Sequence, residues 1–181
     1  MEVVRVIKNT RQLVEISILV AMAFVLDMTS NLYAGWFWVY GGSVSLSLVP
    51  IAVLGYRHGW KIGFLGGFAM GLLQLLFGAI IIHPIQVLFD YPLPFALLGL
   101  AGIWAHRVNK GSRAAYYIWL STFVGSFFRF VSHTFSGYIF FGAGWLASAL
   151  YNFPYVGASW VLSALALTIL YRRYAKLFKP F

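Results

Sequence analysis

Residues 57–82 read RHGWKIGFLGGFAMGLLQLLFGAIII, and this stretch indicates the class of fold. Arg57 and Lys61 stand at its start, and residues 62–82 carry no charged side chain. About 20 apolar residues are enough for a helix to cross the hydrocarbon core of a bilayer. The stretch therefore predicts a membrane-spanning helix with its basic end fixed on one side.

The same alternation of basic and apolar segments runs through the whole chain. The basic residues fall into five groups: Arg5/Lys8/Arg11, Arg57/Lys61, Arg107/Lys110/Arg113, Arg172/Arg173/Lys176/Lys179, and Arg129 alone inside an apolar run. Three connecting regions contain no Lys or Arg, namely 30–43, 79–91 and 141–151. Basic residues favour cytoplasmic loops, so this pattern predicts a polytopic membrane protein with both termini in the cytoplasm. We expect an all-α fold, one integral membrane domain over 1–181, with six transmembrane helices at about 12–30, 43–57, 61–82, 84–106, 114–140 and 150–172.

Composition supports a lipid environment and excludes several functions. Apolar residues make up 61% of the chain and charged residues 9%, whereas soluble domains carry about 25% charged residues. The net charge of +9 is spread over separate loops, which favours contact with anionic membrane lipid and argues against nucleic acid. Cysteine is absent, so disulfides and thiol chemistry are excluded. The apolar segment near the start runs into Asp27 without a small-residue cleavage site, so we expect no cleaved signal peptide.

Small residues and prolines indicate close helix contacts. Gly63, Gly67 and Gly71 recur at four-residue spacing, a stripe that lets another helix approach closely, either within the chain or from a partner. Ser17 and Ala21 have the same spacing in the first span. Prolines lie within or near the spans at positions 50, 92, 94 and 154, where they indicate either packed kinks or the wall of a polar cavity.

The chain has four acidic residues, and two of them stand at the outer ends of expected spans. Asp90 is interpreted either as the counter-ion of a cationic ligand or as the partner of Arg129 in a structural ion pair. For Asp27, we favour a helix-end carboxylate that faces water or pairs locally. Ionisable groups inside a membrane domain usually face a cavity or a partner, so both carboxylates mark places of interest.

Polar residues of the fifth and sixth spans can meet at the same outer level. Arg129 and His133 are one helical turn apart and Gly137 continues their face. Asn152 begins the sixth span, and aromatic residues crowd the outer loops. Most of these rings fit an interfacial aromatic belt, but aromatic faces beside a carboxylate also suit a flat cationic ligand.

Motifs of several enzyme classes are missing from the sequence. It contains no phosphate-binding G-x-x-x-x-G-K-[ST] loop and no H-E-x-x-H zinc motif. A Ser43/His133 pair lacks the elbow motif of a serine nucleophile. We therefore expect no catalytic residues, no bound metal and no cofactor.

In order, the segments Gly41–Ser45, His83–Gln86 with Asp90-Tyr91, Gly125–Arg129 with His133 and Gly137, and Tyr151-Asn152 resemble the thiamine-specific S components of energy-coupling-factor transporters. The resemblance covers nearly the whole chain. It implies a six-helix bacterial cell-membrane protein that binds thiamine near the outer surface. It also implies partners, namely a transmembrane coupling subunit and two ATPase subunits.

The resemblance also implies roles for particular residues. It makes Asp90, Tyr91, His133 and Asn152 ligand contacts, with Gly137 and Tyr151 beside them. It makes Ser17 and Ala21 the surface where the coupling subunit docks, although the family motif usually has Ala at both ends. For the stacking Trp that family members can place after the fifth span, the register offers Phe141 or Trp145, and we favour Trp145.

Two further positions depart from the family pattern or stay open. A Tyr found in some members five residues before the Asn is Ala147 here, so Tyr151 or a loop aromatic is expected to replace it. In the first outer loop we favour Trp38 over Trp36 as a pocket wall. The expected function is thiamine capture for an ATP-driven importer. The alternatives are an S component for another vitamin, an intramembrane enzyme using His133 and Asp90, and a structural subunit without a ligand.

Overall fold

The computed structural model describes residues 10–77 and 79–180, and in those residues all regular secondary structure is helical. Arg5 and Lys8 of the first basic group lie outside the described residues. Three helices are long: α1 (Thr10–Ala34), α7 (Ala114–Phe140) and α8 (Trp145–Tyr174). The shorter ones are α2 (Leu48–His58), α3 (Trp60–Gln74), α4 (Pro84–Asp90), α5 (Pro92–Leu98) and α6 (Ala105–Asn109). Short 3-10 segments are η2 (Gly35–Phe37), η3 (Gly99–Trp104) and η4 (Ala175–Phe178).

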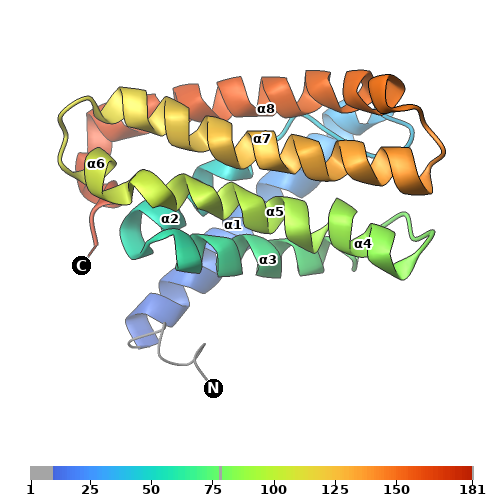
Figure 1. Ribbon diagram of the computed structural model, residues 1–181. Coiled ribbons are helices and arrows are strands. Elements are labelled where there is room, and N and C mark those ends of the chain that lie inside the picture. The colour runs from blue at the N-terminus through green and yellow to red at the C-terminus, as the bar shows by residue number, and fades with distance from the viewer. Residues whose placement is uncertain (1–9, 78, 181) are drawn as a thin grey trace.

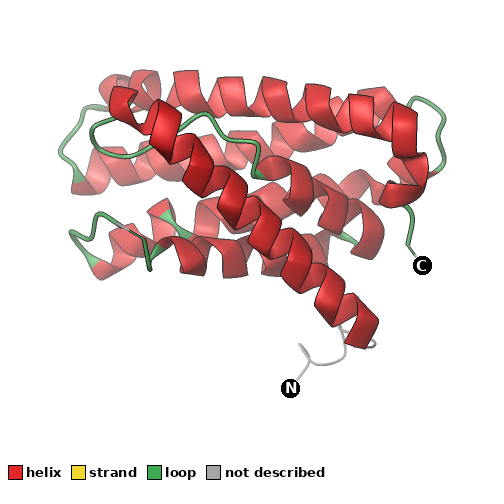
Figure 2. Ribbon diagram, turned by 180° about the vertical axis from the view of Figure 1, so that it is seen from behind, coloured by secondary structure: helices red, strands yellow, loops and turns green. Residues whose placement is uncertain are grey.

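The helices form an elongated bundle with two distinct ends. Helices α7 and α8 pack side by side, and α3 packs along α5 (Figure 1). Helix α1 crosses the bundle diagonally, and its first turns project beyond the other helices (Figure 2). The α6 segment, the start of α7 and the end of α8 share one end of the bundle (Figure 1). Helix α4 and the α7–α8 connection lie at the opposite end.

The glycine stripe of α3 makes an internal contact. A Cβ atom added at Gly67 would overlap the backbone carbonyl oxygen of Phe95, and one at Gly71 would lie 2.5 Å from the Cα of Pro92. One at Gly63 would lie 2.9 Å from the carbonyl oxygen of Gly99. The stripe therefore lets α3 pack backbone to backbone against α5 and η3, which decides between the two interpretations that the sequence left open.

Three segments expected to be long helices are shorter or interrupted. Helix α2 begins only at Leu48, and residues 43–47 form part of the connection before it. Pro50 stands in the first helical turn, where a backbone N–H would have no intrahelical partner. Helix α3 ends at Gln74 rather than near residue 82. The 84–106 segment breaks at Tyr91, because proline disfavours helical geometry in the residue before it and Pro92 starts the next helix.

Large apolar side chains cover much of the outer surface of the bundle. Examples are Leu76, Leu146 and Phe153, each exposed by more than 60%. Among the described residues, three helical stretches are long and apolar enough to cross a membrane: Thr10–Tyr33, Pro84–Asn109 and Trp145–Phe178. A surface this apolar is suited to lipid, so the chain is a helical membrane protein, and the count of six crossings stays a prediction.

Candidate functional site

A cavity of about 620 Å³ opens between α1, the end of α3, α4, α5, α7 and α8. Tyr40–Ser43 of the first long connection and Phe141 after α7 line it as well. The cavity therefore lies at the α4 end of the bundle, opposite α6 (Figure 1). Its volume is in the range of sites that bury a small organic molecule.

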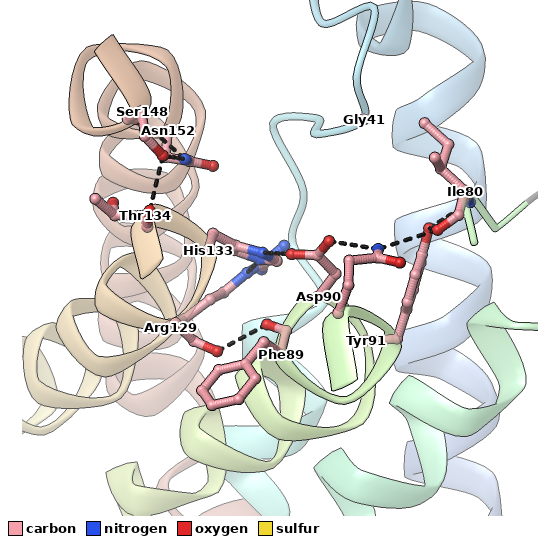
Figure 3. A network of polar contacts seen from close by, with 12 residues as sticks. Gly41, Ile80, Phe89, Asp90, Tyr91, Arg129, His133, Thr134, Ser148 and Asn152 are labelled. Atoms are coloured by element: carbon pink, nitrogen blue, oxygen red, sulfur yellow. Dashed lines mark hydrogen bonds and ion pairs between the residues drawn. The ribbon is translucent and has the colours of Figure 1, made fainter. Parts of the chain in front are cut away.

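Asp90 lies at the centre of a polar network on one wall. Gln86 Nε2 donates a hydrogen bond of 2.6 Å to its Oδ2, and His133 Nδ1 lies 3.5 Å from its Oδ1 (Figure 3). On the far side of the imidazole, Arg129 Nε donates to His133 Nε2 over 3.4 Å. This pattern fits a neutral imidazole that carries its proton on Nδ1, next to Asp90.

Arg129 does not form the direct ion pair with Asp90 that the sequence left as an alternative. Within the described residues, the imidazole of His133 stands between the two, and the Arg129 guanidinium lies 4.6 Å from the ring centre of Phe95. Helical spacing explains the arrangement, because Arg129 and His133 are one turn apart on α7. His133 reaches Asp90 of α4, and Arg129 reaches Phe95 of α5. Arg129 still contributes a positive charge to the same cavity.

Tyr91 and Gln86 hold the segment after α3 against α4. The backbone N–H of Ile80 donates to the Tyr91 hydroxyl at 2.7 Å, and Gln86 Nε2 donates to the Ile80 carbonyl at 3.0 Å. Gln86 Oε1 accepts from the N–H of Ile82 at 3.0 Å. Tyr91 lines the cavity as expected, but Gln86 is a connecting residue that the sequence did not single out.

The opposite wall comes from α7 and α8. Asn152 Nδ2 donates to the carbonyl oxygen of Ser148 at 2.8 Å, and the Tyr155 hydroxyl donates to Asn152 Oδ1. Gly137 faces Ser148, whose hydroxyl donates to the Thr134 carbonyl at 2.9 Å. The predicted residues Gly137 and Asn152 line the cavity, and so does Tyr155.

Tyr155, rather than Tyr151, supplies the hydroxyl beside Asn152. Tyr151 lines the cavity too, but its hydroxyl donates to the Gly41 carbonyl at 3.0 Å and accepts from the Tyr40 N–H at 2.9 Å. It therefore ties the first long connection to α8. Tyr155 lies one helical turn past Tyr151 on the same face of α8, and the sequence interpretation did not name it.

The two tryptophans predicted as pocket walls lie outside the cavity lining. The Trp145 ring stacks on Tyr138, with ring centres 4.5 Å apart, and Phe141 is the aromatic residue that lines the cavity after α7. Trp38 packs edge-on against Tyr155, with ring centres 5.6 Å apart, and so reaches the site only through that tyrosine. Trp36 is 83% exposed.

Asp27 is a charged cavity residue to which the sequence interpretation gave no ligand-binding role. Its side chain is 4% exposed, it lines the cavity, and it accepts hydrogen bonds from Ser47 Oγ at 3.1 Å and Gln74 Nε2 at 2.7 Å. Of the two alternatives favoured from the sequence, a carboxylate that faces water or one that pairs locally, the first is wrong because Asp27 is buried and hydrogen-bonded. Its two partners come from α3 and from the connection before α2, which the α1 sequence could not reveal.

The remaining expectations concern the Ser17/Ala21 surface of α1, a Ser43/His133 catalytic pair and a metal site. Ser17 and Ala21 are exposed on α1, and the Ser17 hydroxyl donates to the Leu13 carbonyl at 3.0 Å. The Ser43 hydroxyl is hydrogen-bonded to Ser30 at 2.6 Å, whereas the polar contacts of His133 among the described residues are with Asp90 and Arg129. In the same residues, no three His, Cys, Asp or Glu side chains gather into a metal-binding group.

A family comparison, two similar sequences and one solved structure all relate this chain to thiamine transporters. The sequence family described as thiamine transporter protein (Thia_YuaJ) matches residues 13–179. A protein named thiamine transporter ThiT from Bacillus subtilis is 32% identical over 95% of this chain and 96% of its own length. A protein of the same name from Lacticaseibacillus paracasei is 31% identical over 55% of each chain. The solved structure of ThiT from Listeria monocytogenes superposes with a TM-score of 0.78 at 27% identity, covering 95% of this chain and all of that one.

Proposed function

The chain belongs to the thiamine transporter protein family (Thia_YuaJ), and from this premise we propose that it is the thiamine-binding S component of an energy-coupling-factor importer. It is a transporter-family membrane protein rather than an enzyme. In this role it captures thiamine from outside the cell and returns it chemically unchanged.

The observation that carries the proposal is the chemistry of the cavity. Thiamine joins a flat aminopyrimidine, which donates and accepts hydrogen bonds, to a thiazolium ring with a permanent positive charge. The cavity offers the carboxylate of Asp90, the amide of Asn152 and the imidazole of His133 as polar groups, with Phe141 and Tyr155 as aromatic walls. Buried polar groups of this kind discriminate strongly, because an analogue that lacks a partner leaves them unpaired.

We assign the ligand contacts to the residues that converge on this space. Asp90, Tyr91, His133, Gly137, Tyr151 and Asn152 all line the cavity, which supports the binding roles implied by the family resemblance. Phe141 takes the stacking position that we first assigned to Trp145, because Phe141 lines the cavity whereas Trp145 packs on Tyr138. Trp38 acts through Tyr155, by supporting the ring from behind.

The proposal also includes an orientation in the bacterial cell membrane. The basic groups at the end of α2, around α6, at the start of α7 and at the end of α8 belong to the end of the bundle away from the cavity (Figure 1). Cytoplasmic loops are enriched in such residues, so the cavity faces outward and both termini face the cytoplasm. Six crossings fit this orientation if each of the short helices α2 and α3 crosses the membrane with the help of the residues that flank it.

A coupling subunit would dock on α1. Ser17 and Ala21 present small side chains on an exposed face of this helix, next to the exposed apolar side chains of Leu13, Ile18 and Met22. Small residues allow a second helix to approach closely within a membrane. The two ATPase subunits would then act through that coupling subunit, since this sequence has no phosphate-binding loop.

A thiamine titration of the purified, detergent-solubilised protein tests the proposal. Intrinsic tryptophan fluorescence is expected to change saturably at low thiamine concentration, through Trp38 next to Tyr155, and riboflavin is expected to have no such effect. Calorimetry covers the case of a fluorescence-silent site. No heat and no fluorescence change with thiamine would refute the assignment, and a saturable response to riboflavin alone would favour an S component for another vitamin.

A further inference from the structure

The buried carboxylate of Asp27 has only neutral partners. Its Oδ1 accepts from the hydroxyl of Ser47 and its Oδ2 from the amide of Gln74. In the described part of the chain, no Lys, Arg or His nitrogen lies within ion-pair distance of it. Both oxygens of the Asp27 carboxylate are therefore held by neutral donors, and a cationic ligand in the cavity would supply the charged partner that makes burial of a carboxylate favourable.

The environment of Asp90 differs from that of Asp27, because a positively charged side chain lies behind one of its direct partners. Its carboxylate contacts the imidazole of His133, and that imidazole in turn accepts a hydrogen bond from the guanidinium of Arg129. A positive charge of the protein therefore lies one side chain away from Asp90. The field of Arg129 partly offsets Asp90 before any ligand enters.

The charged side chains that line the cavity have a net charge of −1. With His133 neutral, the ionised groups of the lining are the carboxylates of Asp27 and Asp90 and the guanidinium of Arg129. A ligand with a single fixed positive charge would make the filled cavity neutral. A neutral ligand of the same shape would leave the charge of Asp27 buried and unpaired.

We propose that Asp27, and not Asp90, is the counter-charge for the thiazolium ring and thus the residue that selects a permanently cationic ligand. Asp90 then serves as a hydrogen-bond acceptor for the uncharged aminopyrimidine half. This division of labour rests on the proposed function and deepens it by assigning the two halves of the ligand to two different carboxylates of the cavity. Ser47 and Gln74 are positioning residues that hold the Asp27 carboxylate toward the cavity.

The test measures affinity for two ligands in four proteins. The ligands are thiamine and its neutral isostere in which the thiazolium nitrogen is replaced by carbon. The proteins are the wild type, Asp27→Asn, Asp90→Asn and the control Glu15→Gln. The control removes a carboxylate from the same helix, but Glu15 pairs with Arg57 and His58 outside the cavity lining.

The asparagine side chain in Asp27→Asn is expected to fit, because the Gln74 amide can turn its oxygen toward the new NH₂ group and the Ser47 hydroxyl can still donate. Breaking a buried charge pair commonly weakens binding by about 100-fold, so we expect that loss for thiamine in this variant. The same variant is expected to bind the neutral isostere within about 3-fold of the wild type, since that ligand offers no charge to lose. Asp90→Asn is expected to weaken both ligands by similar factors, and Glu15→Gln neither.

The possible outcomes distinguish failure of the Asp27 assignment from failure of the proposed function. Equal loss of both ligands in Asp27→Asn, or a selective loss of thiamine in Asp90→Asn, would overturn the assignment of the counter-charge. If Asp27→Asn does not fold, Asp90→Asn still tests the assignment, because a selective loss of thiamine there overturns it. Wild-type protein that binds the neutral isostere as tightly as thiamine overturns it as well. A wild type that binds neither ligand would instead overturn the proposed function itself.

Discussion

Replacing Gly137 by alanine should disturb the α7–α8 wall of the cavity through one hydroxyl group. The added Cβ would overlap the Oγ atom of Ser148 and stand 3.2 Å from its Cβ, so the hydroxyl must rotate away. That rotation breaks the buried 2.9 Å hydrogen bond to the Thr134 carbonyl, worth about 1 kcal/mol. Overpacking adds about 1–3 kcal/mol, and the better helix propensity of alanine returns about 1 kcal/mol. The net loss in the free energy of unfolding is therefore about 1–3 kcal/mol.

A double-mutant cycle isolates this mechanism. Ser148→Ala alone should lose about 1 kcal/mol with the hydrogen bond. In the pair Gly137→Ala with Ser148→Ala the obstructing oxygen is gone, so the double variant should be no less stable than Ser148→Ala. The coupling between the two sites should thus be about 1–3 kcal/mol. Thermal unfolding in detergent, followed by tryptophan fluorescence, measures it, because about 1 kcal/mol shifts the midpoint by about 2–4 °C at this chain length. Additive losses in the double variant would refute the reasoning.

Three further changes test other parts of the structure. Gly67→Ala should lower the unfolding midpoint strongly, because its Cβ would overlap the backbone of Phe95. The control Gly157→Ala should not, because no atom lies within 4 Å of its added Cβ. Equal midpoints in the two variants would contradict the packing of α3 on α5. Asp90→Asn should weaken thiamine binding by about 10-fold or more through a lost charge-assisted acceptor, as measured by fluorescence titration; unchanged affinity would remove Asp90 from the site. Ser17→Trp should block co-purification with a coupling subunit and spare thiamine binding; a surviving complex would place the docking surface elsewhere.

The helical class could be predicted from sequence because it depends on local patterns. The apolar run at 114–140 is long, lacks proline, and coincides with helix α7. The glycine spacing in α3 correctly indicated a close helix contact, although only the structure identifies α5 and η3 as the neighbours. The break at Tyr91 was also encoded locally, by Pro92, but the sequence interpretation treated 84–106 as one continuous span.

Parts of the cavity could not be predicted, because they depend on residues far apart in the sequence. Asp27 is a pocket residue only because Ser47 and Gln74 come to it from other segments. The choice between Phe141 and Trp145 depends on where α7 ends and α8 begins, and the 141–151 connection is shorter than expected because α8 already starts at Trp145. Trp145 at the start of α8 stacks on Tyr138 near the end of α7, and sequence spacing alone does not reveal such a tertiary contact.

The most direct test of the central claim is an experimental structure of this protein with thiamine bound. We expect density for the vitamin in the cavity between α1, α4, α7 and α8, with its thiazolium ring toward Asp27 and its aminopyrimidine toward Asp90 and Asn152. Density for thiamine elsewhere on the protein, with this cavity still empty, would contradict the claim.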